Sequence, residues 1–387
     1  MKIAIINTYA NGSTGTIASI IGQYSKKQGN DVRYYYGREK QKDNEWVYVG
    51  ENKLALSVSN ALSFFTGKIG SFHVFSTKKL INELKKFNPD VIHIHNIHGN
   101  YLNFKLLFNY LKSFPGKVII TLHDEFLLTG RCALCLCDKW KKGCEKCPHK
   151  SAYPRTLFDK SKKLQQEKIA FLKSLKDLTL VAPSKWLSVL IDSSKIAFLD
   201  HRCIHNGLPE PVLNEIDLNG IIDNDRINIL FAAYTWSEDK GALIIKELAK
   251  KIDCSKFNIV VAGYDDYCSN WFDFDCKKVG LLKREQLLFL LNKVDVFVNP
   301  TFKDNLPTIL IESLQVGTPA ITFDTGGCGE IIDNSCGTIV SNKTSEALLE
   351  VIEHFDYKKN WKAHCYNKAK DFSLEKMANS YLTLYKE

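Results

Sequence analysis

Long apolar runs are missing from this sequence. No stretch approaches the roughly 20 consecutive apolar residues that a membrane-spanning helix needs, so we expect no transmembrane helix. The opening residues, MKIAIINTYA, are too short and too soon interrupted by polar residues for a signal peptide, and they predict a first β-strand instead. We therefore expect a cytosolic protein.

Recognition signals for nucleic acid and for dinucleotides are also missing. The net charge is +9, but no RNA- or DNA-binding motif accompanies it, so nucleic acid is not an expected partner. No complete G-x-G-x-x-G string is present, which leaves each glycine-containing turn as a weak signal when it is taken alone. The remaining composition, 45% hydrophobic and 25% charged, is that of an ordinary globular protein.

The pattern of strands and helices predicts two domains. A chain of 387 residues suits two domains of roughly 150–200 residues each. Short continuous apolar strands alternate with helices in both halves, which is typical of parallel sheets covered on both faces. The predicted strands are 2–7, 31–36, 90–95, 117–122 and 178–182, then 227–232, 257–262, 277–281, 295–298, 319–322 and 337–340. We predict an α/β fold with Rossmann-like doubly wound domains at 1–205 and 206–370 facing across a cleft, and a helix at 371–387 packing back on the first domain.

The strongest chemical signal is the string NPTFKDNLPTILIESLQVG. A loop carrying Asp304 and Asn305 leads into a helix that is predicted to begin near Leu306. The N-terminus of such a helix offers free N–H groups and a partial positive charge to a phosphate. Glu312 lies about one and a half turns inside, where its carboxylate can accept hydrogen bonds from both hydroxyls of a ribose. A surface Asp and an ordinary helix Glu are the alternative interpretation.

Further residues are suited to binding phosphate. Lys240 follows a predicted strand at a predicted helix start, where an ammonium can bind a diphosphate as a point charge. A solvated lysine is the alternative. Two turns would let backbone approach a phosphate closely, one with Gly12 and Gly15 after the first strand, and one with Gly326 and Gly327 after a late strand.

Histidines gather at strand ends in the first half. His93 and His95 alternate within one strand and share a face, and we expect a polar strand end that lines the cleft rather than a metal pair. His123 follows the strand KVIITL, where it is placed to hydrogen-bond a sugar hydroxyl or the reacting region. A D-x-D string, Asp273 to Asp275, falls in a predicted loop and is not expected to hold a metal.

Cysteine is abundant, with five of twelve cysteines inside sixteen residues. Four thiolates from Cys132, Cys137, Cys144 and Cys147 suit a closed tetrahedral zinc site, with Cys135 as an alternate ligand. Buried free thiols are one alternative, but so polar a loop cannot bury five, and a disulfide is disfavoured in a reducing cytosol. We predict a structural zinc in the insertion 132–147, with a role in folding the loop.

Positive charge is concentrated as well. Residues 138–173 contain eleven Lys or Arg and four Asp or Glu, a local +7 that leaves only +2 for the rest of the chain. Such a patch suits an anionic membrane surface or a phosphorylated acceptor, and a solvated helix face is the alternative. The apolar segment 54–65 has helical character and adds to the case for a membrane surface.

In combination, these strings resemble the family-four glycosyltransferases of the GT-B fold. The spacing Asp304-x7-Glu312 is similar to that family's E-x7-E motif, and the strings DNLPT and HIHNIHG resemble a bacterial subgroup used in surface polysaccharide synthesis. TLHDEFLLTGRC, VAPSKWL around Ser184 and HNGLP at Asn206 are further similar strings. The resemblance covers nearly the whole chain.

The resemblance implies a retaining hexosyltransferase that moves a sugar from a nucleotide-diphospho-sugar to a lipid-linked or oligosaccharide acceptor, peripherally at the inner face of the cell membrane. No catalytic cofactor is implied. Glu312 would bind the donor ribose, Lys240 the diphosphate, and His123 the transferred sugar. The other implied donor contacts are Asp304, the backbone of Asn305 and Leu306, and the glycines Gly12, Gly15, Gly326 and Gly327.

Two positions depart from the family pattern. Tyr234 stands where many members have an Arg six residues before the Lys, and Asp304 is one methylene shorter than the usual Glu. A GT-B nucleotide-sugar epimerase and a non-catalytic glycosyltransferase-like subunit therefore stay open as alternative functions.

Overall fold

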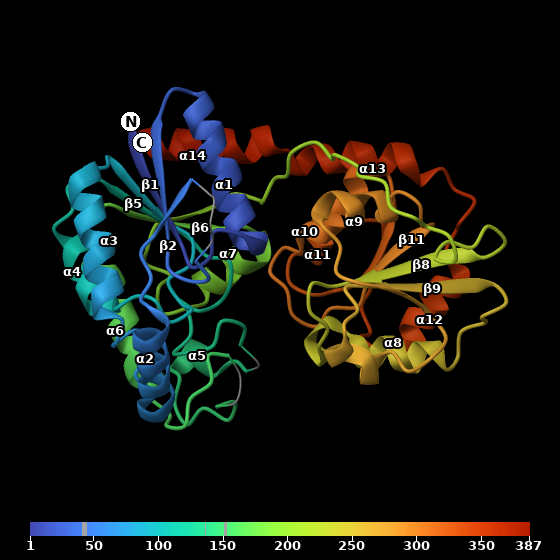
Figure 1. The fold of residues 1–387 in the computed structure, drawn as a ribbon, viewed down its shortest axis with the longest axis horizontal. Helices are drawn as coiled ribbons and strands as arrows, with labels where there is room; N and C mark the ends of the chain where they lie inside the picture. The colour runs from blue at the N-terminus through green and yellow to red at the C-terminus, as the bar shows by residue number, and fades with distance from the viewer. Residues whose placement is uncertain (41–44, 136, 151–152) are drawn as a thin grey trace. The chain divides into compact units, whose positions relative to one another are not determined.

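The computed structural model describes residues 1–40, 45–135, 137–150 and 153–387, which form two compact units. Unit 1 comprises Met1–Asn206 together with Met377–Glu387, and unit 2 comprises Gly207–Lys376. In Figure 1 each unit shows a central sheet with helices packed around it.

Unit 1 is built on a seven-stranded sheet in the order β3-β2-β1-β4-β5-β6-β7, with every neighbouring pair parallel. The strands are β1 (Lys2–Asn7), β2 (Asp31–Tyr36), β3 (Trp46–Tyr48), β4 (Val91–Ile94), β5 (Lys117–Thr121), β6 (Leu178–Ala182) and β7 (His201–Cys203). The helices are α1 (Gly12–Lys27), α2 (Lys53–Thr66), α3 (Val74–Phe87), α4 (Phe104–Lys112), α5 (Lys139–Lys142), α6 (Ser161–Lys173), α7 (Lys185–Asp192) and the C-terminal α14 (Leu374–Lys386). The central strands β4 and β6 are buried along their whole length, as expected for a parallel sheet that is covered on both faces.

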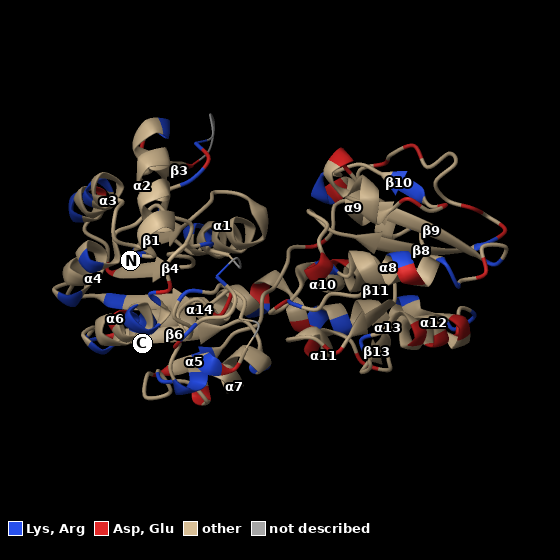
Figure 2. Ribbon diagram, turned by 90° about the horizontal axis from the view of Figure 1, so that it is seen from below, with Lys and Arg blue, Asp and Glu red and all other residues tan. Residues whose placement is uncertain are grey.

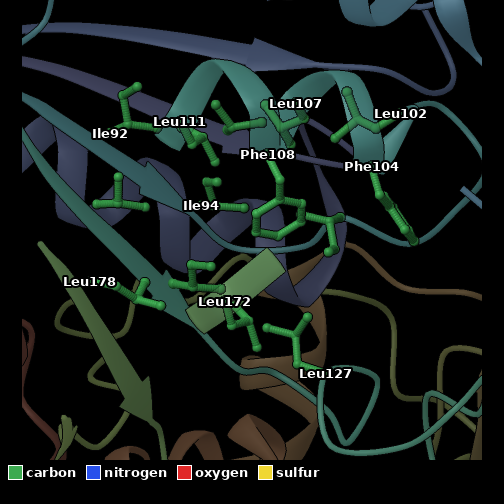
Figure 3. Packing of buried hydrophobic residues seen from close by; sticks show 14 of the residues in the cluster. Ile92, Ile94, Leu102, Phe104, Leu107, Phe108, Leu111, Leu127, Leu172 and Leu178 are labelled. Atoms are coloured by element: carbon green, nitrogen blue, oxygen red, sulfur yellow. The ribbon is translucent and has the colours of Figure 1, made fainter. Parts of the chain in front are cut away.

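Figure 3 shows part of the hydrophobic core on one face of this sheet. Leu107, Phe108 and Leu111 lie on the buried side of α4, and they pack in one cluster with Ile92 and Ile94 of β4. The spacing of the α4 residues by one, three and four positions places them on a single helix face. This packing buries the face of β4 that carries Ile92 and Ile94, and His93 lies on the opposite face.

Unit 2 has a six-stranded parallel sheet in the order β10-β9-β8-β11-β12-β13. The strands are β8 (Ile227–Ala232), β9 (Phe257–Ala262), β10 (Lys277–Val279), β11 (Val296–Asn299), β12 (Ala320–Phe323) and β13 (Gly337–Val340). The α-helices are α8 (Ala242–Ala249), α9 (Arg284–Leu291), α10 (Thr308–Gln315), α11 (Cys328–Ile331), α12 (Ser345–His354) and α13 (Trp361–Ala369). Short 3-10 helices are η1 (Glu238–Lys240), η2 (Asp266–Trp271) and η3 (Lys370–Phe372).

The predicted α/β class with two doubly wound units is confirmed. With β1 and β8 each counted as the first strand, six strands of both sheets follow the order 3-2-1-4-5-6 of a doubly wound Rossmann sheet. All eleven predicted strands are present, each within two residues of its predicted ends. The strands β3 and β7 were not predicted, because an edge strand of three residues is too short to carry a pattern.

Two helix starts differ from the prediction. Helix α1 begins at Gly12, so Gly12 and Gly15 lie in its first turn rather than in a turn before it. Helix α8 begins at Ala242, and Lys240 ends the preceding 3-10 helix η1 instead of starting an α-helix. Gly241 separates the two helices in a left-handed conformation with a φ of 80°.

Candidate functional site

The carboxyl ends of β8 and β11 in unit 2 bring together two of the predicted site residues. Lys240 Nζ lies 2.7 Å from Asp304 Oδ2, and both side chains are partly exposed. The loops that carry them are joined through Asp239, whose backbone carbonyl accepts hydrogen bonds from the Phe302 N–H at 2.8 Å and the Thr301 hydroxyl at 3.2 Å. The ammonium and the carboxylate are therefore held at one edge of the sheet.

The two late glycines pack against this same loop. Gly326 has a φ of 54°, and a Cβ there would lie 2.0 Å from the Asp304 carbonyl oxygen, so only glycine fits. The Gly327 N–H donates to the Asn305 carbonyl oxygen at 2.6 Å. Asn305 and Leu306 are buried.

Helix α10 follows directly and carries Glu312. It begins at Thr308, one position after Pro307, and among the described residues no side chain caps its N-terminus. Its first N–H groups are therefore open to an anion from outside the chain. The predicted phosphate-binding helix end thus lies next to the Lys240–Asp304 pair, where a nucleotide diphosphate could use both.

Glu312 has a partner that the sequence did not suggest. Arg284, the first residue of α9, places Nε 2.6 Å from Glu312 Oε1. Burial raises the pKa of Glu312, while the guanidinium of Arg284 opposes that shift. Arg284 Nη2 is buried and has no hydrogen-bond partner within the described residues, so it can donate to a ligand beside Glu312. An arginine at the first position of a helix was the available sequence signal, and it is a weak one.

The structure also places Tyr234 and the D-x-D string. Tyr234 is 83% exposed beyond the end of β8, and its ring packs in neither hydrophobic core. Asp273 of the D-x-D string forms an ion pair with Lys246 at 2.8 Å, and this hydrogen-bonded contact lowers the pKa of Asp273. Asp273 thus already has a partner of opposite charge.

In unit 1, the predicted glycines have a packing role. A Cβ on Gly15 would lie 2.7 Å from the backbone carbon of Ala10, so the residue must be glycine for α1 to close on the loop after β1. Asn7 supports this loop by donating from Nδ2 to the Tyr9 carbonyl at 2.9 Å and to the Thr14 hydroxyl at 3.1 Å. A role for Gly12 and Gly15 in phosphate binding stays a prediction.

His123 is half-buried and lies at the end of a row that continues through the buried His95 and His93. Its Nε2 is 2.8 Å from His95 Nδ1, and the two rings stack at 5.1 Å between centroids. His93 in turn contacts His95, with ring centroids 4.2 Å apart, and it hydrogen-bonds Thr121 at 2.8 Å and Tyr385 at 2.7 Å. Tyr385 belongs to α14, so the C-terminal helix is anchored beneath this strand end. His93 therefore supports the interior of unit 1 and does not line an open surface, contrary to the prediction.

Hydrogen bonding indicates which ring nitrogens of His95 and His123 carry a proton. His95 Nε2 is buried without a partner in the described part of the chain. A buried N–H without an acceptor is less tolerated than an unpaired acceptor, so the His95 proton resides on Nδ1 and is donated to His123 Nε2. His123 then carries its own proton on Nδ1. Burial lowers the pKa of His123 to about 4 and that of His93 to about 3, which keeps both rings neutral at pH 7.

The five clustered cysteines lie close together. Cys132 hydrogen-bonds with both Cys135 and Cys147, and the contact with Cys135 is the main cause that lowers its pKa to about 6. Cys135 Sγ lies 3.9 Å from Cys137 Sγ, and the Gly130 N–H donates to Cys144 Sγ at 3.0 Å. Within 1–40, 45–135, 137–150 and 153–387, however, no three His, Cys, Asp or Glu side chains are arranged to hold a metal ion. The structural zinc stays a prediction.

The basic stretch 138–173 is less uniform than its composition suggests. Lys168 is buried, donates to the Phe126 carbonyl oxygen and lies over the Phe126 ring, and burial lowers its pKa to about 7. Lys141 pairs with Asp138 and Lys162 with Glu145, each at 3.1 Å. Figure 2 shows the colour of Lys and Arg on both α5 and α6. Part of the local +7 charge therefore lies inside the fold, and part of it is paired with acidic side chains on the surface.

Comparison with known proteins finds a family match within unit 2. Residues 226–355 match the family described as glycosyl transferases group 1. A protein of Escherichia coli, named as a colanic acid biosynthesis glycosyl transferase, is 26% identical over 68% of this chain and 66% of its own length. The N,N'-diacetylbacillosaminyl-diphospho-undecaprenol alpha-1,3-N-acetylgalactosaminyltransferase of Campylobacter jejuni is 26% identical over 42% of this chain and 45% of its own. The matches thus span about two thirds or less of these relatives.

Solved structures resemble the chain along its whole length. Sucrose-phosphate synthase from Thermosynechococcus elongatus superposes with a TM-score of 0.69 at 13% identity, covering 100% of this chain and 98% of that one. The Anabaena protein HepE in complex with UDP gives a TM-score of 0.64 at 12% identity, covering both chains completely. At these identities the likeness establishes the fold. The chain has the GT-B fold, and its residues 226–355 match the group 1 glycosyl transferases.

Proposed function

We propose that the chain is a retaining glycosyltransferase of surface polysaccharide synthesis, which takes a sugar from a nucleotide-diphospho-sugar. One observation carries this proposal: Lys240 and Asp304 meet at 2.7 Å beside the uncapped N-terminus of α10, inside the region that matches the family. The ammonium and the helix end offer the positive potential that a diphosphate requires. The UDP in the structurally similar HepE complex supports a nucleotide donor.

Each residue of this site has a chemical role in the proposal. The leaving diphosphate gains negative charge as the bond to the sugar breaks, and Lys240 Nζ and the α10 N–H groups stabilise that charge. Asp304 orients Lys240. Glu312 accepts the ribose hydroxyls, and Arg284 keeps its buried carboxylate ionised. Retention follows when the acceptor hydroxyl attacks from the face that the diphosphate leaves.

The acceptor is proposed to be a lipid-linked saccharide. The name of the Campylobacter relative specifies a diphospho-undecaprenol acceptor for that protein, and the Escherichia relative is named for an extracellular polysaccharide. No helix in the described part of the chain is long and apolar enough to cross a membrane. The chain would then reach its acceptor from a peripheral position on the bilayer.

Donor binding is the decisive test. Thermal shift with UDP-, GDP- and ADP-linked sugars selects the donor, and titration calorimetry then compares the wild type with Lys240→Ala and Glu312→Gln. Each change removes a charge-assisted contact, so we expect the donor Kd to rise about 10- to 100-fold with the fold retained. Lys358→Ala and Glu247→Gln, which alter exposed residues elsewhere in unit 2, serve as matched controls. Wild-type affinity in both site variants would refute the assignment.

The products separate the alternatives. Incubation of the donor alone, followed by proton NMR of the sugar, detects an epimerase as an isomerised nucleotide-sugar. A non-catalytic subunit binds the donor but releases no nucleotide diphosphate with any acceptor. The anomeric coupling constant of a transferred sugar reports retention directly.

A further inference from the structure

Helix α2 presents an apolar stripe that nothing in the described chain covers. Leu54, Val58, Leu62 and Phe65 are 76%, 52%, 42% and 57% exposed, and their spacing places them along one side of the helix. Only Ser63 of this helix is buried. Between Leu54 and Gly67 the sequence contains no charged residue, and Figure 2 accordingly draws α2 in tan with lysine colour only toward one end.

A second segment extends this stripe. The Leu157 N–H donates to the Phe64 carbonyl oxygen at 2.9 Å, and the Arg155 guanidinium lies 5.8 Å from the Phe64 ring. Leu157 and Phe158 are themselves 46% and 58% exposed. Two stretches of chain about 90 residues apart thus meet in one exposed apolar patch, which is larger than the scattered apolar residues of an ordinary surface.

Lysines border the patch beside a hollow. A pocket of about 440 Å³ is lined by Lys68, Lys160, Lys163 and Glu167, together with Ser71, Phe72 and Leu164. Lys163 lies 3.8 Å from Glu167, whereas Lys68 and Lys160 have no ion pair with a described residue. A Cβ built on Gly67 would come within 3.2 Å of Lys160, which shows that the pocket adjoins the end of α2. We call the stripe, residues 157–158 and these three lysines the α2 surface.

We propose that the α2 surface docks the protein on an anionic phospholipid bilayer. Helix α2 would lie in the plane of the interface with its stripe among the upper acyl chains, and Lys68, Lys160 and Lys163 would contact lipid phosphates. The inference rests on the proposed function in one respect, because a lipid-linked acceptor must be met at a membrane.

The pattern of charge favours a bilayer over a protein partner. An interfacial helix combines an apolar face with flanking Lys and low overall charge, and a polybasic rim adds attraction to anionic headgroups. The rim has three lysines against one glutamate, and α2 itself carries no acidic residue. The pocket adjoins the carboxyl end of α2, where Lys160 approaches Gly67, so apolar and cationic groups lie next to each other there.

Vesicle co-sedimentation tests the proposal with the full chain. Vesicles of phosphatidylglycerol with phosphatidylethanolamine should bind the wild type, and binding should weaken as salt rises, because the Debye length is only about 8 Å at 0.15 M. Val58→Ser with Leu62→Ser removes apolar contact without adding charge. Lys68→Gln with Lys160→Gln removes two rim charges. We expect each double variant to lower the partition coefficient about tenfold or more.

Matched variants keep the result specific. Val189→Ser with Val212→Ser changes two apolar residues that are 63% and 65% exposed elsewhere, and Lys358→Gln with Lys386→Gln removes two exposed lysines elsewhere. Both controls should bind vesicles like the wild type. Equal loss in the controls, or wild-type binding by both α2 surface variants, would overturn the proposal.

Two further measurements separate the remaining outcomes. If sedimentation velocity without lipid shows a dimer that the Val58/Leu62 variant dissolves, α2 is a contact between copies and the bilayer proposal fails. Donor titration is run on the same variants and should be unchanged, since no α2 surface residue belongs to the donor site. Vesicle binding without any donor binding would sink the proposed function while leaving the docking surface intact.

Discussion

Units 1 and 2 share one strand order, but the side chains that follow the carboxyl ends of their strands differ in charge. In unit 2 the candidate residues are charged and paired, Lys240 with Asp304 and Arg284 with Glu312. In unit 1 the carboxyl ends of β4 and β5 lead into the neutral, hydrogen-bonded pair His95 and His123. The same scaffold thus supports an electrostatic site in one unit and a neutral hydrogen-bonding site in the other. Site chemistry follows from the loops, and the sheet supplies the position.

The largest expected effect concerns metal in unit 1, where unit 2 has no counterpart to the cysteine cluster. We predict close to one zinc per chain in protein purified without a metal-binding tag. Four thiolates around zinc carry two net negative charges, which the buried cations Arg131 and Lys168 beside the cluster would offset. Cys144→Ser with Cys147→Ser should abolish the metal and destabilise unit 1 by about 5 kcal/mol or more, as measured by elemental analysis and urea unfolding.

Single variants identify the fourth ligand of that site. Cys135→Ser and Cys137→Ser each change one cysteine of the wild type, so whichever variant loses zinc marks the ligand, and Cys254→Ser at an exposed position serves as control. Zinc-free protein with five titratable thiols in the loop and full activity would contradict the prediction.

The second prediction concerns the ion pair between Arg284 and Glu312 in unit 2. Arg284→Gln leaves the buried Glu312 carboxylate without its partner, and we expect a loss of about 2 kcal/mol, less than for a fully buried pair because Arg284 is 28% exposed. Urea unfolding followed by hydrogen exchange in unit 2 measures it. The double variant Arg284→Gln with Glu312→Gln should recover part of the loss, whereas simple additivity would show that the pair is not coupled.

The third prediction uses acid to distinguish the units. Burial holds the pKa of His93 near 3, below its unfolded value of 6.5. Between these two pH values the unfolded state binds a proton at His93 and the folded state does not. Stability is therefore full above pH 6.5 and falls as the pH drops below it, by about 1 kcal/mol between pH 6.5 and 5.5 for this residue. Hydrogen exchange at the two pH values should show the loss in unit 1, and His93→Gln should reduce it. An equal loss in the variant would assign the effect to other groups.

The smallest effect is expected for Asp273, whose substitution should leave turnover nearly unchanged. Asp273 is engaged by Lys246 on the surface of unit 2, and the proposed charge stabilisation comes from protein groups, so Asp273→Asn should change turnover less than about twofold. Turnover should also survive a short incubation with EDTA. Complete loss that magnesium or manganese restores would instead assign the D-x-D string to the chemistry.

Local pattern predicted most of the fold and only part of the candidate site. Buried parallel strands have short apolar runs in the sequence, so the predicted bounds of β1, β4 and β8 lie close to the observed ones. The string around Asp304 indicated a helix start and a phosphate-binding loop. Arg284 escaped notice, because its meeting with Glu312 depends on how α9 packs beside α10, and no spacing within either helix encodes that contact.

The sequence by itself determined the two doubly wound sheets and the glycines at crowded backbone positions, because each depends on residues that are near one another in the chain. Only the tertiary structure decided that Lys240 pairs with Asp304 across 64 residues, that His93 is locked under Tyr385 across 292, and that α2 shows its apolar stripe outward. The sequence of an apolar helix does not indicate whether the helix is buried or exposed. The packing of the rest of the chain decides which face it covers, and here it leaves that of α2 open.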